Sequence, residues 1–403
     1  MSERDIATQC CIAGGGPAGI LLGYLLARAG IEVTVLEKWP DFFRDFRGDT
    51  IHPSTLEALH ELGLLEDFLL LPHNKMERMT FNIGGKAVTV ADLRRLHTRC
   101  PYIAFIPQWD FLNFMVREAS RFPAFHLLMA TEAVELQRKD GRATGIRAKD
   151  AEGMFDISAE LVMGADGRHS TIREQGGFAV DPLSVPIDVL WFRVARTSTD
   201  DLQSLAYAEG GKALVMLDRS EYWQCALIIE KGGLDAIKKK GLPAFRTSIA
   251  SLAHLDPALL AEVDSWEKVK LLSVTVDHAK EWAHEGVAII GDAAHAMSPL
   301  GGVGINYAIQ DAIAAANILI PAFNENDLSL KTLMKIQARR QKPTLRMQKV
   351  QVFMQDRLLS PILRTKGPLR GLWFLNLFSW FPILQRIPAH VIGIGFQPEH
   401  IRH

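Results

Sequence analysis

Three glycine-rich segments of this 403-residue chain combine residue types that could bind a dinucleotide and hold negative charge. In the first, Gly14, Gly16 and Gly19 have the G-x-G-x-x-G spacing, and Glu37 follows about twenty residues later. The first glycine allows a tight turn, the second lets a pyrophosphate approach the backbone, and the third lets a helix pack closely on a strand. The amides and positive dipole of that helix N-terminus would bind the phosphates.

Glu37 indicates which dinucleotide is bound. A carboxylate at this position accepts hydrogen bonds from the adenosine ribose and disfavours a 2′-phosphate, so FAD or NAD is favoured over NADP. The residues predicted to line this site are Gly14, Gly16, Pro17, Ala18, Gly19, Glu37 and Lys38.

The second and third segments each place a carboxylate at the end of an apolar run. Asp166 begins a segment in which Ser170 or Thr171 could cap a helix, although this segment alone is more typical of a surface turn. Asp292 precedes a glycine-rich loop and an alanine-rich helix that includes Asn306. Backbone amides exposed before a helix N-terminus suit a site that stabilises negative charge.

Hydrophobic periodicity predicts an α/β fold around these segments. Residues 10–13, 20–28 and 31–36 read as a strand, a helix and a strand, which is a βαβ unit. Residues 79–90 predict a β-hairpin that turns at Gly84 and Gly85. Four later runs, rich in β-branched and aromatic residues, predict a second, antiparallel sheet: residues 187–196, 213–218, 222–229 and 268–276.

The order of these elements predicts a chain whose first domain is built from separate blocks. A helix is expected over residues 306–320, with Pro321 beyond its end. The predicted nucleotide-binding domain comprises residues 1–75, 100–182 and 277–345. The predicted β-sheet substrate domain comprises residues 76–99 and 183–276, and a helical C-terminal segment covers residues 346–403.

Composition and charge exclude several classes of protein. Lys and Arg total 45 against 46 Asp and Glu, so the formal net charge is −1 and no basic field is available for a nucleic acid. The four cysteines lack metal-binding spacing, from which we expect no metal site and a reducing compartment. We read neither a signal peptide nor a run of about 18 apolar residues, and therefore expect a cytoplasmic protein.

Taken together, the three segments resemble those of the class A flavoprotein monooxygenases, the p-hydroxybenzoate hydroxylase-like FAD enzymes. The resemblance extends from about Ile6 to about Arg346, and the segments have the order and separations of that family. It implies a Rossmann-like FAD-binding domain with an inserted antiparallel β-sheet substrate domain and a helical C-terminus.

The resemblance also assigns roles to individual residues. Arg47 would contact the phosphate and ribityl region of the flavin, Gln108 the ribityl chain, and Asp292 the ribityl hydroxyls. Asp166 would lie near the pyrophosphate and take part in binding the nicotinamide cofactor. The backbone amides expected to face the pyrimidine edge of the isoalloxazine ring are those of Gly304, Ile305 and Asn306.

The chemistry implied by the resemblance is hydroxylation. NADH or NADPH would reduce FAD, O₂ would add to give a flavin C4a-hydroperoxide, and one oxygen atom would pass to an aromatic or quinone-like substrate. The chain has one dinucleotide fingerprint, so the nicotinamide cofactor would dock transiently. The alternatives are a flavin-dependent halogenase, whose Trp-x-Trp-x-Ile-Pro signature is missing here, a reductase of isoprenoid-type double bonds, and an FAD-binding protein without turnover.

The substrate-binding residues are less well defined by the sequence. Trp191, Met216 and Trp223 could line an aromatic-binding pocket together with Pro299, or they could be ordinary core residues. His52 could activate a phenol or position the substrate, or it could be structural.

A C-terminal run of aromatic and aliphatic residues has two interpretations. Residues 371–385 are flanked by basic residues, including Arg364 and Arg386, and could lie in a membrane interface. Because Pro382 and Pro388 interrupt the run, a helix packed over the FAD domain or a dimer contact is favoured. Both a monomer and a homodimer are compatible with the sequence.

Overall fold

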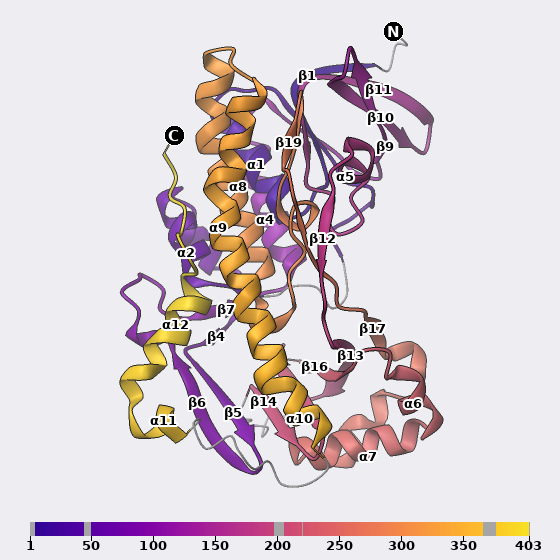
Figure 1. The fold of residues 1–403 in the computed structure, drawn as a ribbon, viewed down its shortest axis with the longest axis vertical. Helices are drawn as coiled ribbons and strands as arrows, with labels where there is room; N and C mark the ends of the chain where they lie inside the picture. The colour runs from indigo at the N-terminus through magenta and orange to yellow at the C-terminus, as the bar shows by residue number, and fades with distance from the viewer. Residues whose placement is uncertain (1–4, 44–49, 197–204, 220, 366–375, 403) are drawn as a thin grey trace.

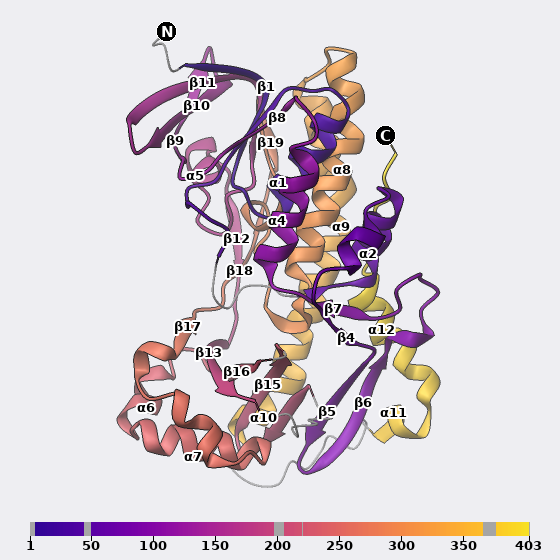
Figure 2. The same cartoon turned by 180° about the vertical axis from the view of Figure 1, so that it is seen from behind.

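The structure is a computed structural model that describes residues 5–43, 50–196, 205–219, 221–365 and 376–402. Figures 1 and 2 show two sheets at opposite ends of the molecule, with the long helix α9 (Leu330–Met354) running along one side from one end to the other.

The first sheet has eight strands and a parallel centre. The strands β19, β20, β11, β1, β2 and β8 follow one another in this order, and β9 and β10 extend from β11. In the register of the sheet, Cys10 of β1 pairs with Leu161 of β11 and with Val33 of β2. Blocks that are distant in sequence therefore build one sheet, as predicted. The strands are β1 (Ile6–Ala13), β2 (Val33–Leu36), β8 (Phe125–Leu128), β9 (Glu132–Lys139), β10 (Arg142–Asp150), β11 (Gly153–Gly164), β19 (Ala283–His284) and β20 (Val287–Ile289).

Helix α8 (Gly304–Asn324) is the central helix of this half of the molecule. It packs against α1 (Pro17–Arg28) on one side and α9 on the other, and α4 (Gln108–Ala119) packs on α1. By length and composition the segment Leu300–Asn324 could cross a membrane, but 78% of its apolar window is buried inside the protein, as expected of a core helix. The helix continues through Pro321, so the predicted end before this proline is wrong; the last turn is closed by Glu325 N–H, which donates to Pro321 O.

The cysteines behave as small apolar residues, as predicted for Cys10 and Cys11. Both are fully buried in β1, and all four cysteines of the chain are free thiols. Burial raises the pKa of Cys11 to about 12, so this thiol stays protonated and unreactive.

The second sheet has seven strands in the order β17, β13, β16, β15, β14, β5 and β6, and all its pairs except β14 with β5 are antiparallel. The predicted hairpin forms as β5 and β6 and turns at Gly84 and Gly85. One face of the sheet packs against α7 (Leu242–Ala253) and the opposite face against α10 (Ser360–Arg364). The strands are β5 (Arg78–Ile83), β6 (Lys86–Asp92), β13 (Ile187–Ala195), β14 (Ala206–Glu209), β15 (Lys212–Asp218), β16 (Tyr222–Glu230) and β17 (Lys270–Leu272).

The strand predicted over residues 268–276 is divided in the structure. Its first part is β17, and its last residue begins β18 (Val276–Ala279), which pairs with β12 (Val180–Leu183) in a two-stranded connection between the two halves. The remaining elements include a three-stranded sheet of β3 (Thr50–Ile51), β7 (Ile103–Phe105) and β4 (Asn74–Met76), and the helices α2 (Pro53–Glu61), α3 (Leu65–Leu69), α5 (Thr171–Gly176) and α6 (Leu234–Lys239).

The described part of the C-terminal region consists mainly of helices, as predicted. After the π-helical turn η6 (Gln355–Leu359) and α10 come α11 (Asn376–Trp380), the 3₁₀ turn η8 (Pro382–Gln385) and α12 (Arg386–Gly393). Helix α9 is continuous across residues 345 and 346, so no break in the backbone marks the boundary predicted there. The architecture is thus an α/β domain with an inserted, largely antiparallel sheet and a helical C-terminus.

Candidate active site

The glycine fingerprint forms the turn between β1 and α1. A Cβ on Gly14 would overlap the carbonyl oxygen of Ala165, and a Cβ on Gly19 would overlap the carbonyl oxygen of Gly14. A Cβ on Gly16, in contrast, would meet no protein atom within 4 Å. Gly16 caps α1 without a side-chain hydrogen bond. The turn is therefore closed around Gly14 and Gly19 and open at Gly16, where a phosphate can approach the helix N-terminus.

The N-terminal turns of α1 and α8 meet at Gly291. A Cβ on this glycine would lie 3.3 Å from Cβ of Ala18 in α1 and 3.4 Å from Cβ of Ala308 in α8. The residue has φ of +62°, so a side chain there would be strained as well as crowded. The positive ends of two helix dipoles thus lie on either side of one turn, and together they favour an anionic ligand.

The N-terminus of α8 is open in the same way as that of α1. No side chain caps it, and a Cβ on Gly304 would meet no atom within 4 Å. The side chain of Asn306 is directed to β3 and the start of α2: Oδ1 accepts from His52 N–H at 2.9 Å and from Thr55 Oγ1 at 2.7 Å, and Nδ2 donates to Thr50 O at 3.1 Å. Asn306 therefore fixes α8 to the β3–α2 connection.

Glu37 lies at the end of β2, next to the fingerprint turn. Its Oε2 accepts from Gly15 N–H at 3.2 Å, and its Oε1 accepts from Trp39 N–H at 3.1 Å. The carboxylate is thus held beside the glycine turn, as ribose recognition requires. Lys38 directs its ammonium group over the ring of Trp39, with Nζ 5.6 Å from the ring centroid.

Asp166 caps α5 through a compact set of hydrogen bonds. Its carboxylate accepts from Ser170 Oγ and, at 3.2 Å, from Ile172 N–H, while Ser170 Oγ accepts from Arg173 N–H at 2.9 Å. Burial raises the pKa of Asp166, and these hydrogen bonds offset part of the rise. The predicted cap at Ser170 is confirmed. The α-carbon of Asp166 is also a close neighbour of Gly14, so the second segment lies against the fingerprint.

Arg168 links the second segment to the third. Its Nε donates to Oδ2 of Asp292 at 3.0 Å, and its Nη2 donates to Met297 O at 3.2 Å. Both side chains of this ion pair are partly exposed. The structure therefore brings all three predicted segments together around the N-termini of α1 and α8.

The cofactor roles of all the predicted residues remain predictions, those of Gln108 and Arg47 included. Gln108 is the first residue of α4, whose N-terminus has no side-chain cap. Arg47 lies outside the described residues.

A buried charge network behind Asp292 was missed by the sequence analysis. Oδ2 of Asp311 accepts from Gly291 N–H at 3.1 Å and from His295 Nε2 at 2.5 Å, and its Oδ1 accepts from Arg340 Nε at 2.9 Å. Arg340 Nη1 also donates to Glu399 Oε1 at 3.2 Å. All four side chains, those of Asp311, His295, Arg340 and Glu399, are almost fully buried.

A row of glutamines on α9 and the turn after it holds the loop that precedes α8. Gln351 Nε2 donates to the carbonyls of Ser298 and Leu300 at 2.9 Å each, and Gln355 Nε2 donates to Ser298 Oγ at 2.7 Å. Half-buried Pro299 lies in the segment that these bonds fix. The sequence signal was present, because glutamines recur at helical spacing through an otherwise basic helix.

The prediction of His52 as a catalytic group is corrected by its surroundings. The ring is fully buried, and its Nδ1 lies 2.7 Å from Ile392 O of α12. Burial lowers the pKa of His52 to about 4, so the ring is neutral at pH 7 and donates its Nδ1 proton to that carbonyl. We therefore assign His52 a structural role between α2 and α12.

We expect buried His52 to make folding stability depend on acid. Its pKa of about 4 in the folded protein lies below its value of about 6.5 in an unfolded chain. The stabilisation from the neutral ring is present above pH 6.5 and is lost as the pH falls towards 4, at up to about 1.4 kcal/mol per pH unit. Urea unfolding followed by tryptophan fluorescence should give a shallower decline for His52→Asn than for the parent protein. Equal slopes for the two proteins would contradict this assignment.

The predicted substrate residues separate onto opposite faces of the seven-stranded sheet. Half-buried Trp191 belongs to an apolar cluster with Val215 and with Leu300 of the loop before α8. Met216 and Trp223 are buried in the other cluster, which packs against α7. Met216 and Trp223 therefore cannot line the same surface as Trp191, because alternate side chains along these strands point to opposite faces of the sheet. Which of the three lines a substrate site stays a prediction.

The described residues fit FAD. The fit is carried by the two open glycines at uncapped helix N-termini, Gly16 and Gly304, because a pyrophosphate and an electron-rich ring edge both need exposed amides and room for close approach. Glu37 and Asp292 add carboxylates at the ends of β2 and β20, where sugar hydroxyls can donate.

Comparison with known proteins agrees with this geometry. The profile of the FAD binding domain family matches residues 7–340. The 6-methylpretetramide 4-monooxygenase of Streptomyces rimosus is 30% identical over 365 residues, which cover 90% of this chain and 87% of that protein. The para-nitrophenol 4-monooxygenase of Pseudomonas sp. (strain WBC-3) is 26% identical over 335 residues, 80% of each chain. The crystal structure of the p-nitrophenol 4-monooxygenase from Pseudomonas putida has the same fold, with a TM-score of 0.80 and 21% identity over 96% of this chain and 97% of that one.

The chain belongs to the FAD binding domain family. It is a class A FAD-dependent aromatic monooxygenase, which uses NAD(P)H and O₂ to hydroxylate a small aromatic compound. These relatives are named monooxygenases, and they do not favour the halogenase or the double-bond reductase.

Proposed function

We propose that the substrate is an apolar phenolic or quinone-like aromatic compound that binds between the seven-stranded sheet and the loop before α8. The observation that carries this proposal is the apolar cluster on the face of the sheet that packs against α10, because Trp191 and Val215 of the sheet and Leu300 of the loop all pack against this cluster. The names of two relatives support it, since one acts on 6-methylpretetramide and another on para-nitrophenol. An aromatic side chain in an apolar wall favours a flat, electron-rich ring.

The cofactor roles proposed for the chain's residues follow from their positions. The amides at the start of α1 bind the pyrophosphate, and Glu37 binds the adenosine ribose. Asp292 binds the ribityl hydroxyls with the part of its carboxylate that Arg168 does not occupy. FAD supplies the redox chemistry: it takes electrons from NAD(P)H and activates O₂. The amides of residues 304–306 stabilise negative charge at the pyrimidine edge of the ring.

Domain limits and partners complete the proposal. Residues 1–75, 100–182 and 277–345 form the FAD-binding domain, residues 76–99 and 183–276 the substrate domain, and residues 346–403 the C-terminal segment. The enzyme acts in the cytoplasm as a monomer or homodimer. A peripheral membrane contact through residues 371–385 is part of the proposal, and residues 376–385 of this range are described in the structure.

The reaction class is tested by anaerobic reduction of the FAD-loaded protein with NADH and NADPH, followed by mixing with O₂. The panel of compounds comprises single-ring phenols, fused-ring phenols, quinolones and quinols. The proposal expects one panel member to accelerate reduction and to gain one oxygen atom from isotopically labelled O₂. Reduction without incorporation of labelled oxygen would instead support the double-bond reductase, and halide-dependent product would support the halogenase.

The position of the substrate is tested by the same substitution on both faces of the sheet. Trp191→Leu is expected to raise KM for the aromatic substrate about tenfold, because it removes a stacking surface worth about 1.4 kcal/mol. Trp223→Leu is the matched control, since this tryptophan lies in the cluster that packs against α7 and its replacement should leave KM unchanged. Steady-state kinetics at saturating NAD(P)H measure both. An equal effect of the two substitutions would argue against the proposed position.

A further inference from the structure

The C-terminal region exposes an apolar surface that the catalytic function does not use. Four residues from the end of α11 to the start of α12, Trp380, Phe381, Ile383 and Ile387, are 65%, 55%, 58% and 63% exposed, respectively. These four residues lie within eight positions of the chain. They are called the C-terminal apolar surface below. Soluble proteins rarely place so many large apolar side chains together in water without a partner.

The inner side of the same segment is well packed. Phe378 and Ile392 pack on a core cluster formed by β5, β6 and residues of η1 (Leu93–Arg95), and Ala389 is fully buried in it. Gln385 Nε2 donates to Phe378 O at 2.9 Å and thereby ties η8 to α11. The four exposed side chains therefore stand on a fixed support at the outer edge of β6, at one corner of the molecule (Figures 1 and 2).

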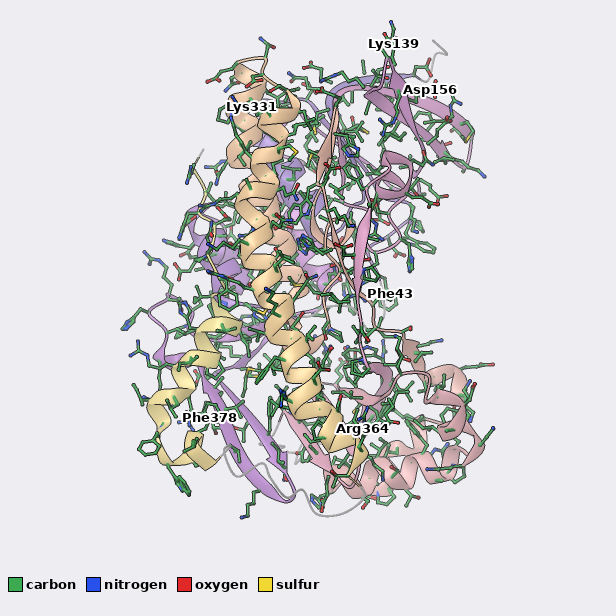
Figure 3. All side chains as sticks on the ribbon, in the orientation of Figure 1. Phe43, Lys139, Asp156, Lys331, Arg364 and Phe378 are labelled. Atoms are coloured by element: carbon green, nitrogen blue, oxygen red, sulfur yellow. The ribbon has the colours of Figure 1, made fainter. Side chains whose placement is uncertain are left out.

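The charge around this surface is positive. The exposed Arg94 and Arg95 of η1, which contacts α12, share one carboxylate, that of Asp92. Arg386 is exposed between Ile383 and Ile387, and its Nη2 lies 3.5 Å from Nε2 of exposed His97. Arg364, at the end of α10, lies on the other side of this half of the molecule from Phe378 (Figure 3) and pairs with Glu230, so it does not contribute to this surface.

We infer that the C-terminal apolar surface docks this enzyme on an anionic lipid membrane. Exposed Trp and Phe side chains insert at the level of lipid headgroups, and flanking cations pair with anionic lipids. A second copy of the chain fits less well, because the four side chains expose on the order of 500 Å², whereas a stable interface buries about 800 Å² per partner. Two like-charged surfaces would also repel each other.

Helix α12 also connects this surface to residues that hold the N-terminus of α8. Helix α12 carries Ile387 on its exposed side and accepts the hydrogen bond of His52 at Ile392. The same helix packs Gly393 against Pro53 at the start of α2. The docking surface and the wall behind the N-terminus of α8 are thus parts of one short helix. This inference rests on the membrane contact proposed above and names its lipid partner, and it is independent of the identity of the substrate.

The test is co-sedimentation of the FAD-loaded full-length protein with vesicles. Mixed phosphatidylcholine and phosphatidylglycerol vesicles are compared with vesicles of phosphatidylcholine alone. The parent protein is expected to bind the mixed vesicles, and to bind them more weakly at high salt. The double substitution Trp380→Ser with Phe381→Ser is expected to weaken binding about tenfold or more. The matched control is Phe353→Ser, because Phe353 is an aromatic residue of α9 with 62% exposure.

Arg386→Glu provides a second variant that keeps the apolar side chains and changes only an exposed charge. Arg386→Glu is expected to weaken binding to the mixed vesicles. The FAD content and melting temperature of each variant are measured to show that the variant is folded. Absence of binding by the parent, or equal binding by the parent and the double variant, would overturn the inference. A change from dimer to monomer in the double variant, seen by light scattering without vesicles, would identify the surface as a contact between two copies and would also overturn it.

Discussion

Gly16→Ala is expected to weaken FAD binding by about 10- to 100-fold while leaving the stability of the apoprotein unchanged. Gly19→Ala is expected to act mainly on stability, and to lower the free energy of unfolding of the apoprotein by about 3 kcal/mol or more. The two glycines belong to the same turn and are replaced by the same residue, so each variant serves as the control for the other.

The reason for the different outcomes lies in the surroundings of each glycine. A Cβ on Gly16 meets no protein atom within 4 Å, and the extended backbone there is open to any residue, so alanine fits the empty turn. The methyl group would instead occupy the space through which a pyrophosphate approaches the amides of α1. A Cβ on Gly19 overlaps the carbonyl oxygen of Gly14, and backbone must move to admit it.

Both effects are measured on apoprotein prepared by removing the flavin. Urea unfolding gives the stability, and quenching of FAD fluorescence on titration gives the dissociation constant. A Gly16→Ala apoprotein as unstable as Gly19→Ala would mean that the turn is closed at Gly16. Unchanged FAD affinity in Gly16→Ala would place the pyrophosphate elsewhere.

The parts of the fold that depend on local pattern could be predicted from the sequence. The fingerprint turn, the hairpin at Gly84 and Gly85 and the cap at Ser170 each depend on neighbouring residues, and each forms as expected. The end of α8 could not be predicted in this way. Pro321 normally ends a helix, but packing of α8 in the core and a final turn closed by Glu325 carry the helix past it.

Errors in the candidate site have a common physical cause. Strand alternation places Trp191 on the opposite face of the sheet from Met216 and Trp223. Which of the two faces meets the loop before α8 depends on the packing of α7 and Leu300, which are distant in sequence. From the sequence alone, His52 is a candidate catalytic histidine. In the structure, Ile392 of α12, 340 residues later in the chain, accepts its hydrogen bond, and the ring is buried. Long-range packing therefore decides which aromatic and titratable residues are available to a substrate.

The charge network behind Asp292 is expected to give the largest effect of any single polar substitution in the described part of the chain. Asp311→Ala should lower the free energy of unfolding by about 3–5 kcal/mol, because it leaves the guanidinium of Arg340 buried with one carboxylate partner fewer. Burial acts to raise the pKa of Asp311, but His295 and Arg340 hold it below its usual value, so the group is ionised in the folded protein.

The same substitution should also weaken FAD binding, by about tenfold. Oδ2 of Asp311 holds the N–H of Gly291 at 3.1 Å and so fixes the turn that carries Asp292 between α1 and α8. Asp311→Asn keeps one oxygen acceptor and should lie between the parent and Asp311→Ala in both measurements. A loss of stability with unchanged FAD affinity would show that the network supports the core but does not position the turn.

An exposed ion pair of the same type supplies the control. Asp264 pairs with Lys268 at 2.8 Å, and more than half of each side chain is exposed. Asp264→Ala should change the free energy of unfolding by less than about 1 kcal/mol, because water screens the pair and solvates either partner alone. Urea unfolding of apoprotein and fluorescence titration with FAD test both substitutions under identical conditions. If Asp311→Ala destabilised the protein no more than Asp264→Ala, the buried network could not be what holds the Gly291 turn in place.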